Sequence, residues 1–173
     1  LPIARELCAG TNTGICVVCD FPFGKSTTES KVAQAEIICR DGDIEDLDIV
    51  ANYGWIRSGR WDDVREDIKA VADVCHKYGS NLKVIFEVDS LTIEEVKRAT
   101  EVAIEAGADF VKTSTGFSTH GATEADVKLM RDTVGADIGV KAAGGIRTYA
   151  DAMKMIAAGA NRLGASAGIA IMK

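Results

Sequence analysis

Residues 106–117, AGADFVKTSTGF, place a lysine at the end of a short apolar run. Asp109 to Val111 is predicted to form a buried strand after a helix that ends at Gly107, and Lys112 stands directly before a Thr-Ser-Thr-Gly turn. An ammonium in this place must be paired, desolvated or used, because lysine is seldom buried without a partner. The stretch therefore predicts a strand that ends in an ion-paired or reactive lysine.

The same arrangement recurs farther along the chain. Ile138-Gly139-Val140 leads into Lys141, and the small residues 142–145, AAGG, follow it. Strand alternation also places Lys112 on the same face as Phe110 and Ser114, while Val111 and Thr113 face the helices. Two strand-end lysines, each followed by a turn of small residues, predict one shared site at the ends of neighbouring strands.

Strands and helices alternate along the rest of the chain. Short apolar runs predict strands, and between them lie amphipathic segments of helical period. A loop carrying Trp55 is expected between Gly54 and Gly59. The other predicted strands cover residues 14–19, 47–50, 82–88 and 162–164, and the predicted helices cover 1–8, a segment capped by Ser26 or Thr27, 61–78, 92–106, 123–134, 149–158 and a short C-terminal piece.

This alternation favours parallel strands joined by right-handed crossovers. A doubly wound open sheet would have a Gly-x-Gly-x-x-Gly first turn, and the sequence contains none. A TIM (β/α)₈ barrel places its chemistry at the carboxyl ends of the strands and its phosphate site after the last two strands. Those are the places of Lys112, Lys141, Gly144-Gly145 and Gly164 to Ser166. The predicted fold class is therefore an α/β barrel.

The number of strands falls short of a closed barrel. Six are predicted, whereas the closed form needs eight strands and roughly 250 residues. The chain begins on a helix and without methionine, so we expect one barrel domain, residues 1–173, with about six of eight β/α units and an incomplete N-terminal part. An open barrel leaves unpaired strand edges that invite self-association, which makes a homo-oligomer a possible assembly.

The composition restricts the classes of partner. The 173 residues carry a net charge of −6, which argues against a polyanion-binding surface and hence against nucleic acid as a partner. Any phosphate site must be local. The sequence has no run of eighteen apolar residues and no signal-peptide pattern, so we predict a cytosolic protein without a membrane partner. Five cysteines, an odd number, favour reduced thiols over a disulfide framework.

The sequence shows no metal-binding pattern. Cys16 and Cys19 form a Cys-x-x-Cys within an apolar strand, but positions three apart point to opposite faces. We expect both to be core thiols. His76 is predicted within a helix and His120 within a loop, and neither has a second ligand at metal-binding spacing. No metal or cofactor is therefore predicted.

A pair of lysines would change the chemistry of the amine. A free lysine has a pKa near 10.4, so about one in 2,500 is neutral at pH 7, and only the neutral amine attacks a carbonyl. Burial beside a second ammonium lowers this pKa. Alternatively, each lysine pairs with a carboxylate such as Asp48 or Glu87. Asp48 is expected to face the barrel interior, where it would be a proton shuttle or only a counter-ion; the residues leave both roles open.

Two small-residue segments outline a phosphate site beside the lysines. Residues 144–148, GGIRT, can turn backbone amides toward an anion, and Gly164-Ala165-Ser166 is predicted to open the last helix. Amides and the helix dipole favour phosphate at such a place. Arg147 is expected as a surface residue near this loop.

These segments resemble the deoxyribose-phosphate aldolases, which are class I aldolases of the TIM-barrel type. Residues 106–117 resemble the Schiff-base strand of that family, and residues 139–148 resemble its second-lysine strand. The resemblance extends over nearly the whole chain. Further matches are DFPFG at 20–24, LDIVANYG at 47–54, KVIFE at 83–87 and RLGAS at 162–166.

The resemblance implies a lyase that reversibly cleaves 2-deoxy-D-ribose 5-phosphate to acetaldehyde and D-glyceraldehyde 3-phosphate, in nucleoside catabolism and without a cofactor. Lys112 would form the Schiff base, Lys141 would lower its pKa, and Asp48 would join the proton relay. The residues implied for phosphate binding are Gly116, Gly144, Gly145, Gly164 and Ser166. The chain departs from the family in lacking its first two strands, and in having Ala142 and Ala167 where proline and a second serine are common.

A function of another class stays open beside this one. In that alternative the chain is a catalytically inactive barrel that binds a sugar phosphate or a protein partner, and its lysines serve charge and structure. A third alternative is another phosphate-binding barrel, such as an isomerase. A trapped imine on Lys112 would separate the first hypothesis from both.

Overall fold

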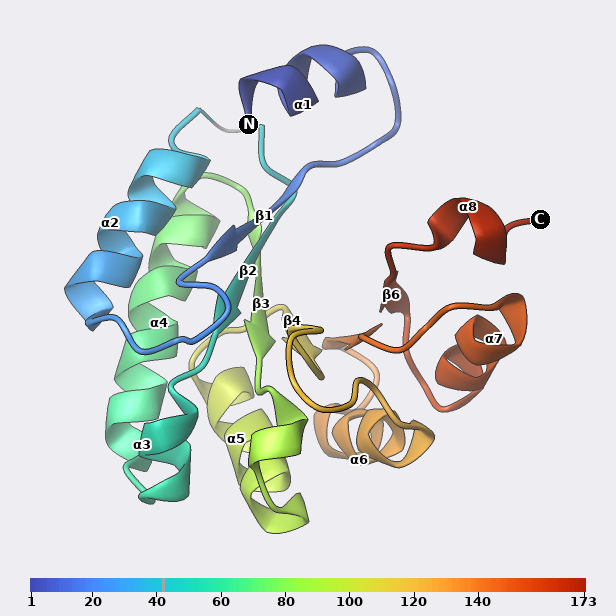
Figure 1. The fold of residues 1–173 in the computed structure, drawn as a ribbon. Coiled ribbons are helices and arrows are strands. Elements are labelled where there is room, and N and C mark those ends of the chain that lie inside the picture. Colours follow the sequence, from blue (N-terminus) through green and yellow to red (C-terminus); the bar gives the residue numbers. More distant parts are fainter. Residues whose placement is uncertain (42) are drawn as a thin grey trace.

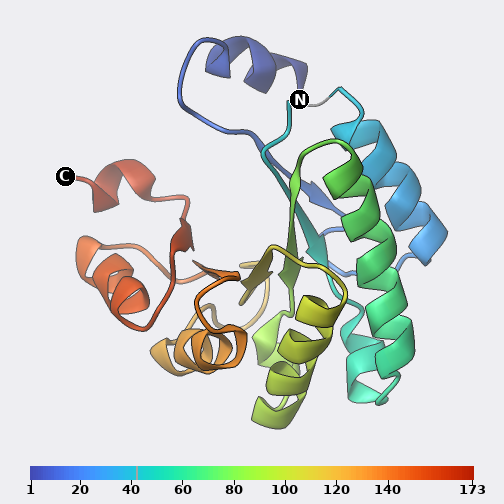
Figure 2. The ribbon, with the colours of Figure 1, turned by 180° about the vertical axis from the view of Figure 1, so that it is seen from behind.

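The sheet decides the architecture of the chain. A computed structural model describes residues 1–41 and 43–173. Within these residues six parallel strands pair in sequence order, from β1 to β6, and curve so that helices cover one face (Figure 1 and Figure 2). The strands are β1 (Cys16–Cys19), β2 (Asp46–Val50), β3 (Asn81–Ile85), β4 (Phe110–Lys112), β5 (Gly139–Ala143) and β6 (Arg162–Gly164).

Four of the helices begin directly after a threonine. The hydroxyls of Thr27, Thr92, Thr123 and Thr148 each accept a hydrogen bond from an amide of the first turn, which satisfies a donor that the helix leaves free. None of the helices in the described residues is long and apolar enough to cross a membrane. The helices are α1 (Pro2–Cys8), α2 (Thr28–Cys39), α3 (Tyr53–Arg57), α4 (Trp61–Lys77), α5 (Ile93–Glu105), α6 (Glu124–Val134), α7 (Tyr149–Ala157) and α8 (Gly168–Ile171), with a 3₁₀ turn at Val88–Ser90.

The strand order confirms the barrel prediction. Each strand pairs with the next one along the chain, as in a (β/α) barrel, whereas a doubly wound sheet reverses its order at a switch point. All pairs are parallel, so the carboxyl ends of the strands meet at one rim of the curved sheet. The described part of the chain therefore has six successive strands of the barrel and their helices.

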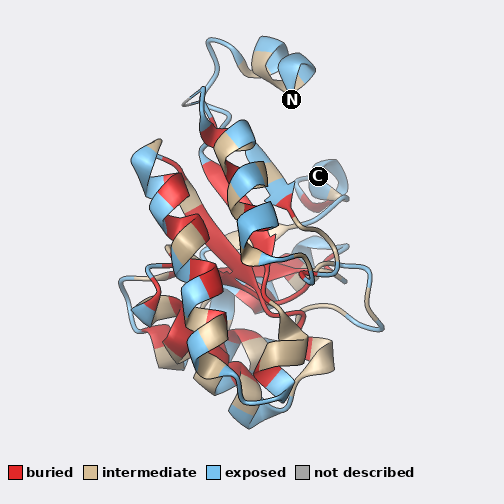
Figure 3. Cartoon of the chain, turned by 90° about the vertical axis from the view of Figure 1, so that its left-hand side faces the viewer, coloured by how far each residue is buried: buried red, intermediate tan, exposed pale blue. Residues whose placement is uncertain are grey.

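Because side chains alternate along each strand, the sheet has one apolar face and one charged face. The apolar core lies between sheet and helices, and Figure 3 shows the buried residues along the strands and the inner faces of the helices. Leu47, Ile49 and Val111 are fully buried there. The alternate positions Asp48 and Lys112 are also buried, but they face the inside of the curve. The interior of the half-barrel is therefore charged.

Two local predictions were wrong. The loop expected around Trp55 is instead helix α3, because the Asn52 side chain accepts a hydrogen bond from the amide of Trp55 and caps it. Strand β3 ends at Ile85 rather than at residue 88, since Glu87 has a φ of 44° and the chain turns into the 3₁₀ segment. Both differences lie at the carboxyl rim, where local hydrogen bonds replace the strand pattern.

Candidate active site

The two strand-end lysines lie side by side on neighbouring strands. Lys112 of β4 and Lys141 of β5 are direct partners in the strand register. Both are buried, with 6% and 9% of their surface exposed. The Nζ atoms lie 2.8 and 2.7 Å from the same oxygen, Oδ2 of Asp48 on β2. The structure thus joins the predicted pair and the predicted interior aspartate in one cluster.

Asp48 is held as a carboxylate by this cluster. Burial by itself would raise its pKa, but the charges and hydrogen bonds of Lys112 and Lys141 outweigh burial and lower the pKa of Asp48 to about 2. Only 1% of the residue is exposed. Asp48 is therefore an ionised carboxylate whose Oδ2 accepts hydrogen bonds from both lysines.

The environment of Lys112 favours its neutral form. Burial lowers the pKa of the Lys112 amine below the ordinary value, and the positive charge of Lys141 lowers it further, while Asp48 acts in the opposite direction. Two ammonium groups share one carboxylate, so release of a proton from one of them relieves the excess of positive charge. The arrangement can therefore supply a neutral amine, the form that attacks carbonyl compounds.

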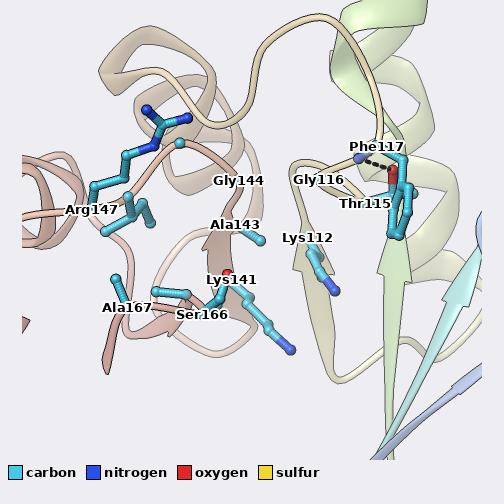
Figure 4. A pocket seen from close by; sticks show the side chains of 14 residues that line it. Lys112, Thr115, Gly116, Phe117, Lys141, Ala143, Gly144, Arg147, Ser166 and Ala167 are labelled. Atoms are coloured by element: carbon cyan, nitrogen blue, oxygen red, sulfur yellow. Dashed lines mark hydrogen bonds between the residues drawn. The ribbon is translucent and has the colours of Figure 1, made fainter. Parts of the chain in front are cut away.

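A cavity of about 500 Å³ lies beside the lysines at the carboxyl rim. In Figure 4 the side chains of Lys112 and Lys141 extend from adjacent strands, with the loop at Gly144 next to them. Arg147, an exposed residue, lies on the far side of that loop and also lines the cavity. All of the residues predicted for phosphate binding line it as well: Gly116, Gly144, Gly145, Gly164 and Ser166.

Gly144 is tightly enclosed and has a conformation that suits glycine. Its φ is 84°, and a Cβ atom there would lie 2.9 Å from the Cα of Gly121. Gly116 approaches from the same side and has a φ of 89°. Two loops thus meet with only backbone between them, which leaves their amides free to face an anion in the cavity.

The segment after Ser166 differs from the prediction. Gly164 to Ser166 was expected to open the last helix, but α8 starts at Gly168 and is only four residues long. Ser166 therefore lies in the turn ahead of the helix. Its position in the cavity wall comes from the end of β6 rather than from a helix N-terminus.

Phe21 is a site residue that the sequence did not single out. Its ring centroid lies 6.0 Å from the Nζ of Lys112. The ring also meets Phe117 edge to face, at 5.7 Å between centroids. The aromatic positions within DFPFG, directly after a strand, were the available signal. The ring of Phe21 gives the lysine an apolar neighbour, which supports its desolvation.

Cys16 is not the core thiol that was predicted. The residue is exposed, and its Sγ lies 3.3 Å from Oδ1 of Asp48 and 4.0 Å from Nζ of Lys141. Cys19 is buried at 1% exposure, so the two cysteines do point to opposite faces, as the strand period requires. Although the residue as a whole is exposed, its thiol is partly desolvated against the charged interior, and this desolvation, together with the charge of Asp48, raises the pKa of Cys16 and keeps the thiol neutral.

Both histidines lie within ion-pair distance of aspartates and away from Lys112 and Lys141. His76 Nε2 lies 2.9 Å from Oδ2 of Asp109, and His120 Nδ1 lies 2.5 Å from Oδ1 of Asp89. Among residues 1–41 and 43–173, no three His, Cys, Asp or Glu side chains gather in a way that could hold a metal ion. The two histidines connect loops and elements rather than forming a site of their own.

Comparison with known proteins gives consistent matches. Residues 5–173 match the profile of the DeoC/LacD family aldolases. A deoxyribose-phosphate aldolase from Mannheimia succiniciproducens is 51% identical over all of this chain and 76% of its own length. Among solved structures, an aldolase called QR15 has a TM-score of 0.89 at 41% identity and is covered over 76% of its length. The tetrameric deoxyribose phosphate aldolase from Aeropyrum pernix has a TM-score of 0.88 at 28% identity, with 98% of this chain and 71% of that chain covered.

Proposed function

The chain belongs to the DeoC/LacD family of aldolases, and on that basis we propose that it reversibly cleaves 2-deoxy-D-ribose 5-phosphate through a Schiff base on Lys112. The products would be acetaldehyde and D-glyceraldehyde 3-phosphate. Relatives named deoxyribose-phosphate aldolase are about 50% identical to this chain over all or nearly all of its length, and they support this substrate. The chain spans about three quarters of the length of these relatives.

One observation carries the assignment of roles. The amines of Lys112 and Lys141 contact the same oxygen of Asp48 at the mouth of the cavity. Lys112 has the lowered pKa that a nucleophilic amine needs, and the charge of Lys141 is one of its causes. We therefore assign the nucleophile to Lys112 and the lowering of its pKa to Lys141.

The reaction follows from these roles. The neutral amine of Lys112 adds to the aldehyde carbon of the sugar, and loss of water gives an imine whose protonated form withdraws electrons. Removal of the proton from the C3 hydroxyl then breaks the C2–C3 bond, which releases glyceraldehyde 3-phosphate and leaves an enamine. Protonation of the enamine and hydrolysis release acetaldehyde and restore the amine. We assign the relay of these protons to Asp48 and Lys141, a role that their contact at 2.7 Å supports.

The phosphate would lie in the part of the cavity away from Phe21. Gly144 and Gly145 both have positive φ and lie in one loop, so successive amides can point to the same anion. Ser166 adds a hydroxyl from the end of β6. Among the described residues that line the cavity, Arg147 is the one charged side chain besides the two lysines, and it lies on the far side of the loop at Gly144. These contacts would hold the phosphate and place the aldehyde end near Lys112.

A substitution at Gly144 tests the phosphate site. Gly144→Ala is expected to raise KM for 2-deoxyribose 5-phosphate by about 10- to 100-fold, because the new Cβ moves the loop and loss of one or two bonds to a charged group costs roughly 1.5–3 kcal/mol. Reaction with acetaldehyde alone, which has no phosphate, should change little. Steady-state kinetics and acetaldehyde trapping measure the two effects.

Gly135→Ala is the matched control for that variant. Gly135 also has a positive φ, 70°, but it follows α6 at the other end of the barrel and has open space around it. Its substitution should reduce stability and leave KM unchanged. An unchanged KM in Gly144→Ala would contradict the assigned phosphate site.

Reduction with borohydride in the presence of acetaldehyde tests the proposed function as a whole. The imine on Lys112 should be reduced to a stable ethyl amine, which peptide mass spectrometry assigns to a residue. An adduct on Lys112 agrees with the aldolase and is not expected for an inactive barrel or for an isomerase. If the chain is folded and Lys112 stays unmodified, the proposed mechanism is wrong.

Three broader statements belong to the same proposal. We propose that residues 1–173 act as one domain, which the single apolar core between sheet and helices supports. A homo-oligomer is supported by the tetrameric relative from Aeropyrum pernix. A cytosolic location is in keeping with small-molecule sugar phosphate and aldehyde substrates and with the acidic composition.

A further inference from the structure

A second group of charges lies beneath the two lysines, inside the curve of the sheet. Lys83 of β3 is fully buried, and its Nζ forms an ion pair with Asp46 of β2. Asp46 also pairs with Arg162 of β6. This lower group reaches the cluster at the rim, because Nζ of Lys83 lies 3.5 Å from Oδ1 of Asp48.

An aromatic ring packs against both cations of the lower group. The ring of Phe110 lies 5.1 Å from Nζ of Lys83 and 4.8 Å from Cζ of Arg162. Gly139 on the next strand leaves room for the ring, since a Cβ there would overlap it. The ammonium of Lys83 thus lies close to this ring and to the two carboxylates of β2, Asp46 and Asp48.

The interior therefore holds a chain of alternating charges. Arg162 is followed by Asp46, then by Lys83, then by Asp48, and Asp48 ends the chain at Lys112 and Lys141. Three ammonium groups and one guanidinium face two buried carboxylates, so the fully ionised group has an excess of positive charge. Any cation added to it or removed from it changes the cost of keeping Lys112 protonated.

We propose that Lys83 is a positioning residue for the reaction: it fixes Asp48 from behind and adds the positive charge that favours the neutral amine of Lys112. Its ammonium faces Oδ1 of Asp48, which leaves Oδ2 to the two lysines at the rim. This role rests on the proposed function, since it concerns the same nucleophile. Lys83 itself is fully buried and is not one of the described residues that line the cavity.

Every strand of the sheet contributes a group to this balance. A change at Lys83 must therefore be interpreted against all of them. The groups are Cys16 from β1, Asp46 and Asp48 from β2, Lys112 from β4, Lys141 from β5, and Arg162 from β6 with Glu45 beside it. Among the described residues Lys83 is the one cation in contact with both carboxylates of β2. Its replacement by a neutral side chain removes a positive charge, which gives the expected effect on Lys112 a defined sign.

The test measures the rate of borohydride trapping with acetaldehyde as a function of pH. Lys83→Met keeps the length of the side chain and leaves Asp46 paired with Arg162. Loss of the positive charge should raise the pKa of Lys112, so the acid limb of the profile should move up by about one pH unit. At pH values below the pKa of Lys112, the trapping rate should be about tenfold lower than in the wild type, since each unit by which the pKa rises removes about nine tenths of the neutral amine. Lys83→Arg should restore the original limb.

Lys31→Met is the matched control. Lys31 is also fully buried and ion-paired, at 2.6 Å from Oδ2 of Asp67, but it lies between α2 and α4 on the helix side of the sheet. Its loss should lower stability without moving the acid limb. The proposal would be overturned if the acid limb of Lys83→Met coincided with that of the wild type. A shift of the same size in Lys31→Met would overturn it as well.

Asp46→Asn gives a second test with the opposite sign. This nearly isosteric change removes a negative charge beside Lys83, so the acid limb should move to lower pH. A purely structural role of Lys83 would not produce opposite shifts in the two variants. If Lys83→Met does not fold, Asp46→Asn alone decides. An acid limb of Asp46→Asn that does not move from its wild-type position overturns the proposal. A wild-type chain that traps no adduct on Lys112 would overturn the proposed function, whereas trapping with unmoved limbs overturns only the role of Lys83.

Discussion

Lys112→Ala is expected to lower kcat/KM for 2-deoxyribose 5-phosphate by about 10⁴-fold or more, because it removes the amine to which we assign the covalent intermediate. The two neighbouring amines are held in other positions: Lys141 lies on the next strand, and Lys83 is fully buried beneath the site. Asp48 keeps Lys141 as a partner, so the interior stays paired. A coupled assay for glyceraldehyde 3-phosphate measures the loss, and mass spectrometry should find no acetaldehyde adduct.

Lys128→Ala serves as the control for this substitution. Lys128 is exposed on α6, where its amine pairs with Asp132 one turn away. Its removal should leave kcat/KM unchanged, since exposed pairs of this kind contribute little. If Lys112→Ala kept activity within tenfold of the wild type at full purity, the nucleophile would have to be another residue.

Lys141→Leu is expected to lower the rate at pH 7 by about 10²- to 10³-fold, chiefly through the pKa of Lys112. The substitution removes the repulsion from Lys141 and leaves Asp48 to Lys112 alone, and both changes stabilise the ammonium. The pKa of Lys112 should rise, and at any pH below that pKa each unit of the rise lowers the amount of neutral amine by about a factor of ten. Activity should therefore return in part as pH is raised.

The pH profile distinguishes this cause from simple damage to the site. Lys141→Arg keeps a positive charge near Asp48 and should move the acid limb much less than Lys141→Leu. A protein harmed only in its fold would lose rate evenly at all pH values. An acid limb of Lys141→Leu that coincides with that of the wild type would show that Lys141 does not control the pKa of its neighbour.

The rim cluster could be predicted from the sequence because it depends on local patterns. Lys112 and Lys141 each end a short apolar run, and parallel strands bring their carboxyl ends to one rim. Asp48 interrupts an apolar strand, so the period of two places it on the interior face. Strand order, side-chain face and proximity all follow from these rules. No contact between side chains had to be known beforehand.

The lower group of charges could not be predicted in the same way. Lys83, Asp46 and Arg162 lie on strands that are not all neighbours, and Arg162 reaches Asp46 across 116 residues of sequence. Long side chains extend beyond their own register position, so the strand period gives their face but not their partner. The exposure of Cys16 escaped prediction for a related reason, since an apolar run does not reveal which of its residues faces the charged interior.

The span of these contacts along the sequence has a consequence for the newly made chain. The strands pair with their immediate successors, so the sheet can form stepwise from local contacts, but Asp48 and Lys141 are 93 residues apart. The amine of Lys112 keeps the ordinary lysine pKa, near 10.4, until burial and Lys141 act on it together. An unfolded or partly folded chain therefore carries an unreactive ammonium at this position. With the roles proposed above, the amine of Lys112 gains its enhanced reactivity toward aldehydes only when the fold is complete.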